Sequence, residues 1–216
     1  MPHAPMPPPP DNRGPGSARP LVICDVDEVV VHFLKGLETF LAERDLWLDP
    51  ASFALNGNIR RLSDDAPVPT DELGGLLTDF FAVRTRFLEA ISGASEALAA
   101  LAPSADIVML TNLPDEFRAD RIANLAGHGI PYPVVTNSGP KGPAIRTLAA
   151  GRQAPVVFID DNHGYLLSAH EHSPRTHLVH FLQDQRFARH VGHFDCMSLR
   201  TDNWTDAGAH LAALIG

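Results

Sequence analysis

The sequence predicts an α/β protein in which a parallel sheet is covered by helices on both faces and carries one mainly helical insertion. From residue 92 onward, short apolar runs typical of buried strands alternate with segments of helical spacing. Strands separated by helices form parallel βαβ units, which place helices on both sides of the sheet. The 216 residues are enough for one such domain with a sizeable core and an inserted part.

The elements of the core are expected in a regular order. The first strand begins at Leu21 and ends in the two aspartates Asp25 and Asp27. Later strands are expected at 107–110, 133–136, 155–159 and 176–182. Helices are expected at 95–101, 114–128, from about 144, at 163–171 and at 206–215. The core therefore comprises residues 21–30 and 92–216.

Residues 31–91 are expected to form the helical insertion, because no clear strand signal interrupts them. Helical apolar spacing covers 36–46, and Thr70 is expected to cap a second helix that reaches about Ile91. Emerging directly after the first strand, the insertion would cover the mouth of a site at that strand's end. Its aromatic side chains are expected to form its own core and docking face: Phe33, Phe40, Trp47, Phe53, Phe80, Phe81 and Phe87. Its arginines are expected to be solvated: Arg60, Arg61, Arg84 and Arg86.

Composition narrows the class of partner. A formal net charge of −9 disfavours non-specific nucleic-acid binding, because no basic surplus is present to neutralise phosphates. No stretch approaches the roughly 20 apolar residues of a membrane span. The two cysteines make no disulfide framework, so we expect a reducing, cytoplasmic compartment. Residues 1–20 are rich in proline and are expected to form a disordered or polyproline-II leader.

Two carboxylates close the first strand. Asp25 and Asp27 are two residues apart, so on a strand their side chains project to the same side. Ligands of open α/β sheets bind at the carboxyl ends of the strands. Two carboxylates this close imply a cation such as Mg²⁺, a shared proton, or both.

Other strands also end in residues that chemistry can use. Thr111 follows one apolar strand, Asp160 and Asp161 follow another, and Lys141 lies between them in a Gly-Pro-Lys-Gly loop. Because the ends of parallel strands converge on one crevice, these groups are expected to meet Asp25 there. Several carboxylates, one hydroxyl and one ammonium suit a Mg²⁺-bound phosphate.

The order of these groups resembles the four motifs of the haloacid-dehalogenase (HAD) superfamily. Asp25-Val26-Asp27, Thr111, Lys141 and Phe158-Ile159-Asp160-Asp161 follow one another on matching elements, and the resemblance covers most of residues 21–182. It implies a Rossmann-like parallel sheet with a cap, here the helical insertion. It also implies the commonest activity of that superfamily, the hydrolysis of phosphate monoesters.

The resemblance assigns a role to each catalytic residue. Asp25 would be the nucleophile that forms an aspartyl-phosphate, and Asp27 the acid that protonates the leaving oxygen and then the base that activates water. Thr111 would bind a phosphoryl oxygen together with the backbone around Asn112. Lys141 would neutralise charge on the nucleophile and on the transferring group.

The resemblance also implies a Mg²⁺ site. Asp160 and Asp161 would hold the ion, completed by Asp25 and the carbonyl of Asp27, and the sequence leaves open which of Asp160 and Asp161 is the direct ligand. One departure is Glu28, where many relatives have glycine, because the turn that leaves the strand must tolerate a side chain there.

The acid at Asp27 favours a phosphatase over dehalogenase- or phosphonatase-like relatives, which lack it. The expected substrate is a small phosphorylated metabolite, with nucleotides as weakly favoured candidates. Two alternatives stay open: a catalytically silent member that binds a phosphorylated ligand or a partner, and a phosphotransferase or phosphomutase. Among the seven histidines between 163 and 193, His163 could touch the site and the others are expected to be structural.

Overall fold

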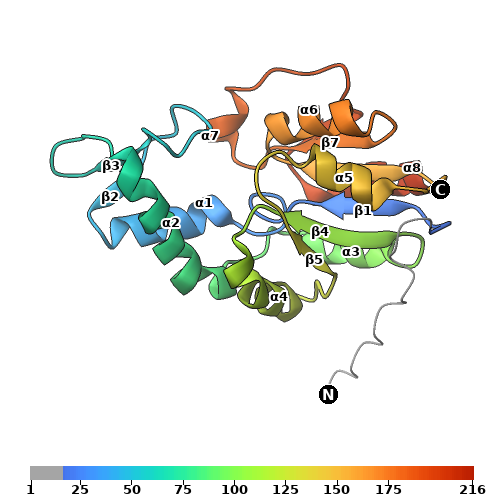
Figure 1. Ribbon diagram of the computed structural model, residues 1–216, viewed down its shortest axis with the longest axis horizontal. Coiled ribbons are helices and arrows are strands. Elements are labelled where there is room, and N and C mark those ends of the chain that lie inside the picture. The colour runs from blue at the N-terminus through green and yellow to red at the C-terminus, as the bar shows by residue number, and fades with distance from the viewer. Residues whose placement is uncertain (1–16) are drawn as a thin grey trace.

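A computed structural model describes residues 17–216, and its centre is a six-stranded parallel sheet (Figure 1). The strand order is β5-β4-β1-β6-β7-β8, with β1 between β4 and β6. The strands are β1 (Leu21–Cys24), β4 (Asp106–Thr111), β5 (Val134–Thr136), β6 (Val156–Asp160), β7 (His177–Phe181) and β8 (Leu199–Thr201). The predicted α/β class with a parallel sheet is confirmed.

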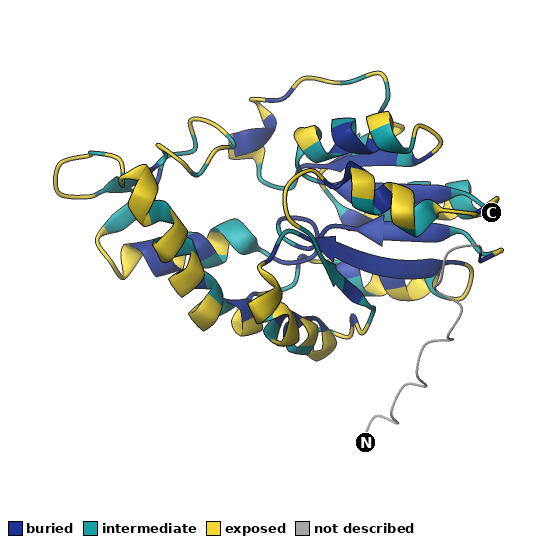
Figure 2. Ribbon diagram, in the orientation of Figure 1, coloured by how far each residue is buried: buried dark blue, intermediate teal, exposed yellow. Residues whose placement is uncertain are grey.

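Helices cover both faces of the sheet, and side chains alternate between the two faces along each strand. On one face α3 (Ala94–Leu101) and α8 (Trp204–Ile215) pack on Val22 and Cys24. On the other face α5 (Gly142–Ala149) and α6 (His163–His172) pack on Leu21 and Ile23. The sheet is therefore buried from both sides, which explains why its strands read as continuous apolar runs (Figure 2).

The segment between β1 and α3 forms the part of the molecule on the left of Figure 1. It contains α1 (Phe33–Ala42), α2 (Thr70–Arg84) and the 3-10 turn η1 (Thr85–Phe87). It also contains a two-stranded antiparallel sheet, β2 (Leu46–Leu48) with β3 (Ile59–Arg61), which the sequence did not predict. Each strand has three residues, too few for a clear periodicity.

Other local predictions need correction. Thr70 is the first residue of α2 and not its N-cap; the cap position is Pro69, and the Thr70 hydroxyl donates to Asn56 instead. The helix expected at 114–128 divides into η2 (Asp115–Phe117) and α4 (Arg118–Gly127). The short helix α7 (Gln185–Ala188) and strand β8 were not predicted.

The proline-rich leader expected at 1–20 lies mostly outside the described residues. Its last four residues are described, and the side chains of two of them bind the body of the protein. Ser17 Oγ donates to Asp106 Oδ2 over 3.0 Å, and the Arg19 guanidinium lies 3.1 Å from Asp106 Oδ1. Within residues 17–216, none of the helices has the length and apolar character needed to cross a membrane.

Candidate active site

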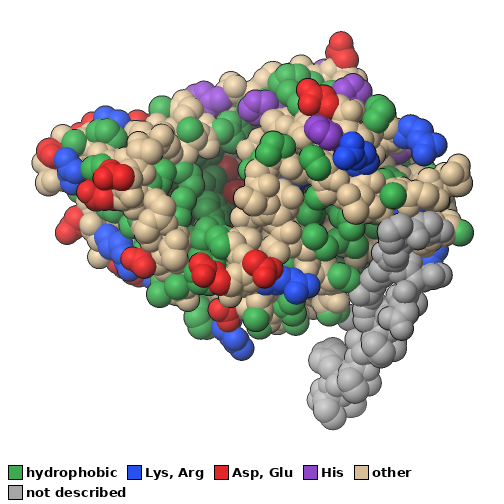
Figure 3. Space-filling view, in the orientation of Figure 1, with side chains coloured by type: hydrophobic (Ala, Val, Ile, Leu, Met, Phe, Trp, Pro, Cys, Tyr) green, Lys and Arg blue, Asp and Glu red, His purple; other side chains and the backbone are tan. Residues whose placement is uncertain are grey.

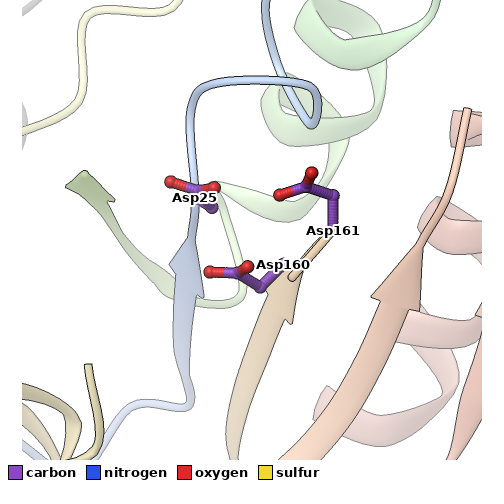
Figure 4. Close-up of side chains that lie close together, drawn as sticks. All are labelled: Asp25, Asp160 and Asp161. Carbon is purple, nitrogen blue, oxygen red and sulfur yellow. The ribbon is translucent and has the colours of Figure 1, made fainter. Parts of the chain in front are cut away.

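Two buried carboxylates lie side by side at the carboxyl end of the sheet (Figure 4). Strand register brings them together: Cys24 pairs with Ile159, so Asp25 and Asp160, one residue further along, are neighbours. The Asp25 N–H donates to the Ile159 carbonyl over 2.9 Å and continues the β1–β6 ladder. Asp25 and Asp160 are 5% and 0% exposed, so the charges at this point are shielded from water.

Lys141 joins the two carboxylates. Its Nζ lies 2.6 Å from Asp25 Oδ1 and 2.7 Å from Asp160 Oδ2, and the side chain is 1% exposed. The close packing of α5 on α6 places it there: a Cβ on Gly142 would lie 2.2 Å from the Ser168 carbonyl oxygen. Only glycine permits this approach, which explains the Gly after the lysine in the loop.

The ionisation of these groups follows from burial. Burial raises the pKa of Asp25 to about 7, although Lys141 opposes the shift, and Asp160 and Asp27 add to it. Burial also raises the pKa of Asp160 above its ordinary value, and that of Asp161 well above. For Lys141 burial opposes the charge, but Asp160 and Asp25 outweigh it and raise its pKa. Three carboxyl groups thus share one lysine, and without a further cation their full ionisation is disfavoured.

A divalent cation fits this surplus. Carboxylate oxygens of Asp25, Asp160 and Asp161 lie within 4.8 Å of one another. Both oxygens of Asp160 already accept hydrogen bonds, from Lys141 (2.7 Å) and from the N–H of Asn162 (2.8 Å). The Asp161 carboxylate has no hydrogen-bond partner among residues 17–216 and lies at the cavity. Oxygen donors of this kind suit Mg²⁺, and the geometry favours Asp161 over Asp160 as a direct ligand.

Asp27 faces the same cavity but has a partner that the sequence analysis missed. Arg121, from α4, is fully buried and its Nη2 lies 2.6 Å from Asp27 Oδ1. Asp27 Oδ2 has no partner in the described part of the chain. Arg121 occupies a position that helical periodicity assigns to the buried face of α4, with Asn124 and Leu125. A polar residue on a buried face was the signal available in the sequence.

Thr111 and Asn112 follow β4, but they do not occupy equivalent places. Thr111 is fully buried and does not line the cavity; its Oγ1 accepts the N–H of Leu113 over 3.1 Å. Asn112 does line the cavity, and its amide nitrogen donates to Tyr165 Oη (2.7 Å) and to the Gly139 carbonyl (3.0 Å). Asn112 thus ties the loop of Lys141 to α6.

Glu28 adopts the left-handed conformation that favours glycine, with φ of 60°. Its side chain is 8% exposed and turns toward the start of α1, where Oε1 accepts the N–H of Leu34 over 2.6 Å. The carboxylate thus satisfies one of the unpaired donors at the helix N-terminus. Burial raises the pKa of Glu28 to about 7, although the Leu34 hydrogen bond opposes the shift.

The histidines do not form a metal site in the described residues: the one cluster of three or more possible ligands there is the aspartate trio. His163 does not line the cavity; its ring stacks on Phe194 with centroids 5.8 Å apart. His180 is buried, and its Nε2 lies 3.0 Å from the Asp161 carbonyl. Burial lowers the pKa of His180 to about 4, so the ring is neutral and Nε2–H donates to that carbonyl.

A cavity of about 390 Å³ lies above Asp25, between the sheet and the segment that follows β1. Figure 3 shows a hollow there, with acidic atoms in its depth and hydrophobic side chains around it. Three aromatic residues expected to be core or docking face pack against the buried core and also line this cavity: Phe33, Phe53 and Phe81. Phe40 and Phe80 are fully buried as expected, and Phe87 is 74% exposed.

No protein-family model and no curated protein matches the sequence. Solved structures match its fold. A HAD family hydrolase from Deinococcus radiodurans R1, with bound phosphate and sodium, has a TM-score of 0.61 and 20% identity, covering 94% of this chain and 97% of that one. A haloacid dehalogenase-like protein of unknown function from Agrobacterium tumefaciens str. C58 has a TM-score of 0.64 and 15% identity, covering 91% and 99%.

A third similar structure is a defluorinating L-2-haloacid dehalogenase, with a TM-score of 0.56 and 18% identity, covering 93% of this chain and 98% of that one. Each of the three is matched over nearly its whole length. The chain therefore has the haloacid dehalogenase-like fold, as the order of its motifs predicted.

Proposed function

We propose that the protein is a Mg²⁺-dependent phosphate-monoester hydrolase that works through an aspartyl-phosphate on Asp25. The observation that carries the proposal is the buried set in which Lys141 bridges Asp25 and Asp160, with Asp161 and Asp27 facing the same cavity. A similar fold that contains bound phosphate supports it. The substrate is a small phosphorylated compound.

Asp25 attacks the phosphorus atom. Lys141 holds Oδ1 of Asp25, so Oδ2 forms the new P–O bond while the ester P–O bond breaks. Lys141 remains between the two carboxylates and offsets the negative charge that develops on the transferring group. The motif order alone assigns Thr111 to a phosphoryl oxygen: its hydroxyl proton is not used by its bond to Leu113, but the side chain is buried and does not line the cavity.

Asp27 moves the proton in both steps. Oδ1 is held by Arg121, and Oδ2 gives a proton to the leaving alcohol oxygen. In the second step the same oxygen takes a proton from the water that attacks phosphorus, and the acyl-phosphate bond breaks to free Asp25. Arg121 acts as a positioning residue because, among the described residues, its side chain donates a hydrogen bond to Asp27 and it does not line the cavity.

Mg²⁺ would be held by Asp161, Asp25 and the carbonyl of Asp27, with Asp160 oriented behind them by Lys141. When bound, Mg²⁺ neutralises the phosphate oxygens and positions them against the nucleophile. The surplus of carboxylates over cations at this site supports the assignment.

A dehalogenase is the competing reading, since one similar structure is a defluorinating L-2-haloacid dehalogenase. A halide leaves as an anion and needs no proton, whereas an alkoxide does. A carboxylate at Asp27, beside the nucleophile and facing the cavity, supports the phosphatase.

The test is Mg²⁺-dependent release of phosphate from p-nitrophenyl phosphate. We expect turnover that stops when EDTA is added and is lost in Asp25→Asn but not in Asp64→Asn, a matched change at an exposed aspartate of the insertion. Halide release from 2-chloropropionate without phosphate release would instead support a dehalogenase. Phosphate transfer to an added alcohol would indicate a phosphotransferase. Tight binding of phosphate esters without turnover would indicate a silent binding protein.

A further inference from the structure

The walls of the cavity are apolar where the substrate's organic group would lie. The segment after β1 contributes six hydrophobic side chains: Phe33, Leu34, Phe53, Leu55, Leu77 and Phe81. All six are only partly buried, so some of their apolar surface faces open space instead of packed core. Soluble proteins rarely leave a contiguous patch of this kind without a use for it.

The charged groups of the cavity are almost all negative. Among the described residues that line it, Lys141 is the one cation, and Asp25 and Asp160 already use its charge. Away from the reaction centre, Glu28 and Asp184 face the cavity. A second phosphate or a carboxylate on the substrate would therefore meet negative charge and no cation.

The arginines of the insertion do not line the cavity, and Arg121 is held by Asp27. Four of them form ion pairs with acids outside the cavity: Arg60 with Asp65, Arg61 with Asp64, Arg84 with Glu43, and Arg86 with Asp120. Arg186 binds Asp184 at 2.6 Å and Glu38 at 2.5 Å. The cavity thus lacks the paired cations by which proteins recognise a second anionic group.

Few polar groups are available for the hydroxyls of a sugar. Both N–H groups of the Asn112 amide are used by Gly139 and Tyr165, and its oxygen accepts one bond from Asn137. Apart from the acids, the lining groups that could bind further hydroxyls are the amides of Asn162 and Gln183 and the hydroxyl of Tyr165. Each hydroxyl buried without a partner costs binding energy, so a polyhydroxylated group is disfavoured.

We propose that the substrate is the phosphate monoester of an apolar alcohol, with an aromatic or alicyclic group and no second charge. This inference rests on the proposed phosphatase function. The volume of about 390 Å³ lies within the range of ligand pockets, typically about 300–1,000 Å³, toward the small end. The phosphate would lie on the floor at Asp25, and the apolar group against the half-buried side chains of the insertion.

A matched pair of esters tests the proposal. Cyclohexylmethyl phosphate and glucose 6-phosphate both carry the phosphate on a primary carbon attached to a six-membered ring, and only the second has ring hydroxyls. We expect kcat/KM for cyclohexylmethyl phosphate to exceed that for glucose 6-phosphate by at least about 100-fold, the scale of discrimination available to a fitted pocket. Equal values, or a preference for glucose 6-phosphate or fructose 1,6-bisphosphate, would overturn the proposal.

A positive charge placed on the apolar wall tests whether the wall determines the selectivity. Leu77 and Val83 both lie on α2, but Leu77 lines the cavity, whereas Val83 does not and is 48% exposed. Leu77→Arg is expected to lower the ratio of kcat/KM for cyclohexylmethyl phosphate over fructose 1,6-bisphosphate by at least about 10-fold. Val83→Arg, which adds the same charge to the same helix, should leave this ratio unchanged. An equal effect of both variants would place the selectivity elsewhere.

Acetyl phosphate distinguishes the substrate proposal from the phosphatase proposal. Its acyl group is small, has no extended apolar part and carries no hydroxyls. If the protein hydrolyses acetyl phosphate in an Asp25-dependent way but does not prefer the apolar ester, the substrate proposal is wrong and the phosphatase stands. If it hydrolyses neither acetyl phosphate nor any ester, the phosphatase proposal fails, and the substrate proposal fails with it.

Discussion

Replacing Glu28 by glutamine should stabilise the metal-free protein, and the gain should grow with pH. In the folded protein burial raises the pKa of Glu28 from its ordinary 4.5 to about 7. Between these values the folded state holds a proton that the unfolded chain has released, so stability falls as pH rises through this interval. Glu28→Gln keeps an oxygen to accept the Leu34 N–H, but it has no charge to bury.

The size of the effect follows from the two pKa values. The raised pKa of Glu28 should cost about 1 kcal/mol of stability at pH 5 and about 3 kcal/mol at pH 8. Since the pKa values of Asp25, Asp160 and Asp161 are raised as well, the pH dependence of the wild type mixes several groups, and the difference between variant and wild type is needed to see Glu28.

The assay is urea unfolding of both proteins at pH 5 and pH 8 with EDTA present, so that no cation binds the neighbouring carboxylates. Glu171→Gln, at an exposed position on α6, is the control and should show no pH-dependent gain. A stability difference between Glu28→Gln and wild type that is the same at both pH values would refute the reasoning.

Three further predictions concern the catalytic set. Arg121→Met should lower kcat toward alkyl phosphates by about 10- to 100-fold with little change in KM, because Asp27 loses the group that positions it. Steady-state kinetics over pH 5–9 would check this. An unchanged kcat would show that Arg121 has no role in the site. Gly142→Ala should destabilise the folded protein by about 1–3 kcal/mol and displace Lys141, since the new Cβ would lie 2.2 Å from a carbonyl oxygen of α6. Thermal unfolding measures the first effect and enzymatic activity the second. A variant as stable and active as the wild type would contradict this prediction. Mg²⁺ at a hundredfold excess over its Kd should raise the unfolding free energy of the wild type by about 2.7 kcal/mol and that of Asp161→Asn far less, as measured by urea unfolding. Equal stabilisation of both proteins would exclude Asp161 as a ligand.

Five of the six strands of the main sheet, all except β8, and their functional ends were predictable because both depend on local sequence. A short apolar run predicts a buried strand, and parallel topology brings the ends of such strands together. The register of β1 and β6 then makes Asp25 and Asp160 neighbours, and Lys141 reaches both of them from the start of α5. No long-range information beyond the βαβ pattern was needed for this part of the site.

The remaining features depend on contacts that local sequence does not encode. The pair of Arg121 with Asp27 joins residues 94 positions apart, and periodicity could mark Arg121 only as a polar residue on a buried face. Strand β2 pairs with β3 across a loop, and its partner Ile59-Arg60-Arg61 has no strand-like alternation. The division of the insertion's aromatics into core and cavity wall depends on how α1 and α2 pack, which composition leaves open.

The hydrophobic core runs without interruption from one face of the sheet into the insertion. Val22 and Cys24 of β1 belong to the same buried cluster as Phe40 and Phe80. Phe33 lies at the edge of that cluster, with its ring centroid 5.2 Å from that of Phe80, and it also lines the cavity. The cavity wall is therefore the open edge of the core and not a separate binding module. An apolar group bound there would extend the packing of the core, so its binding should also hold the insertion against the sheet.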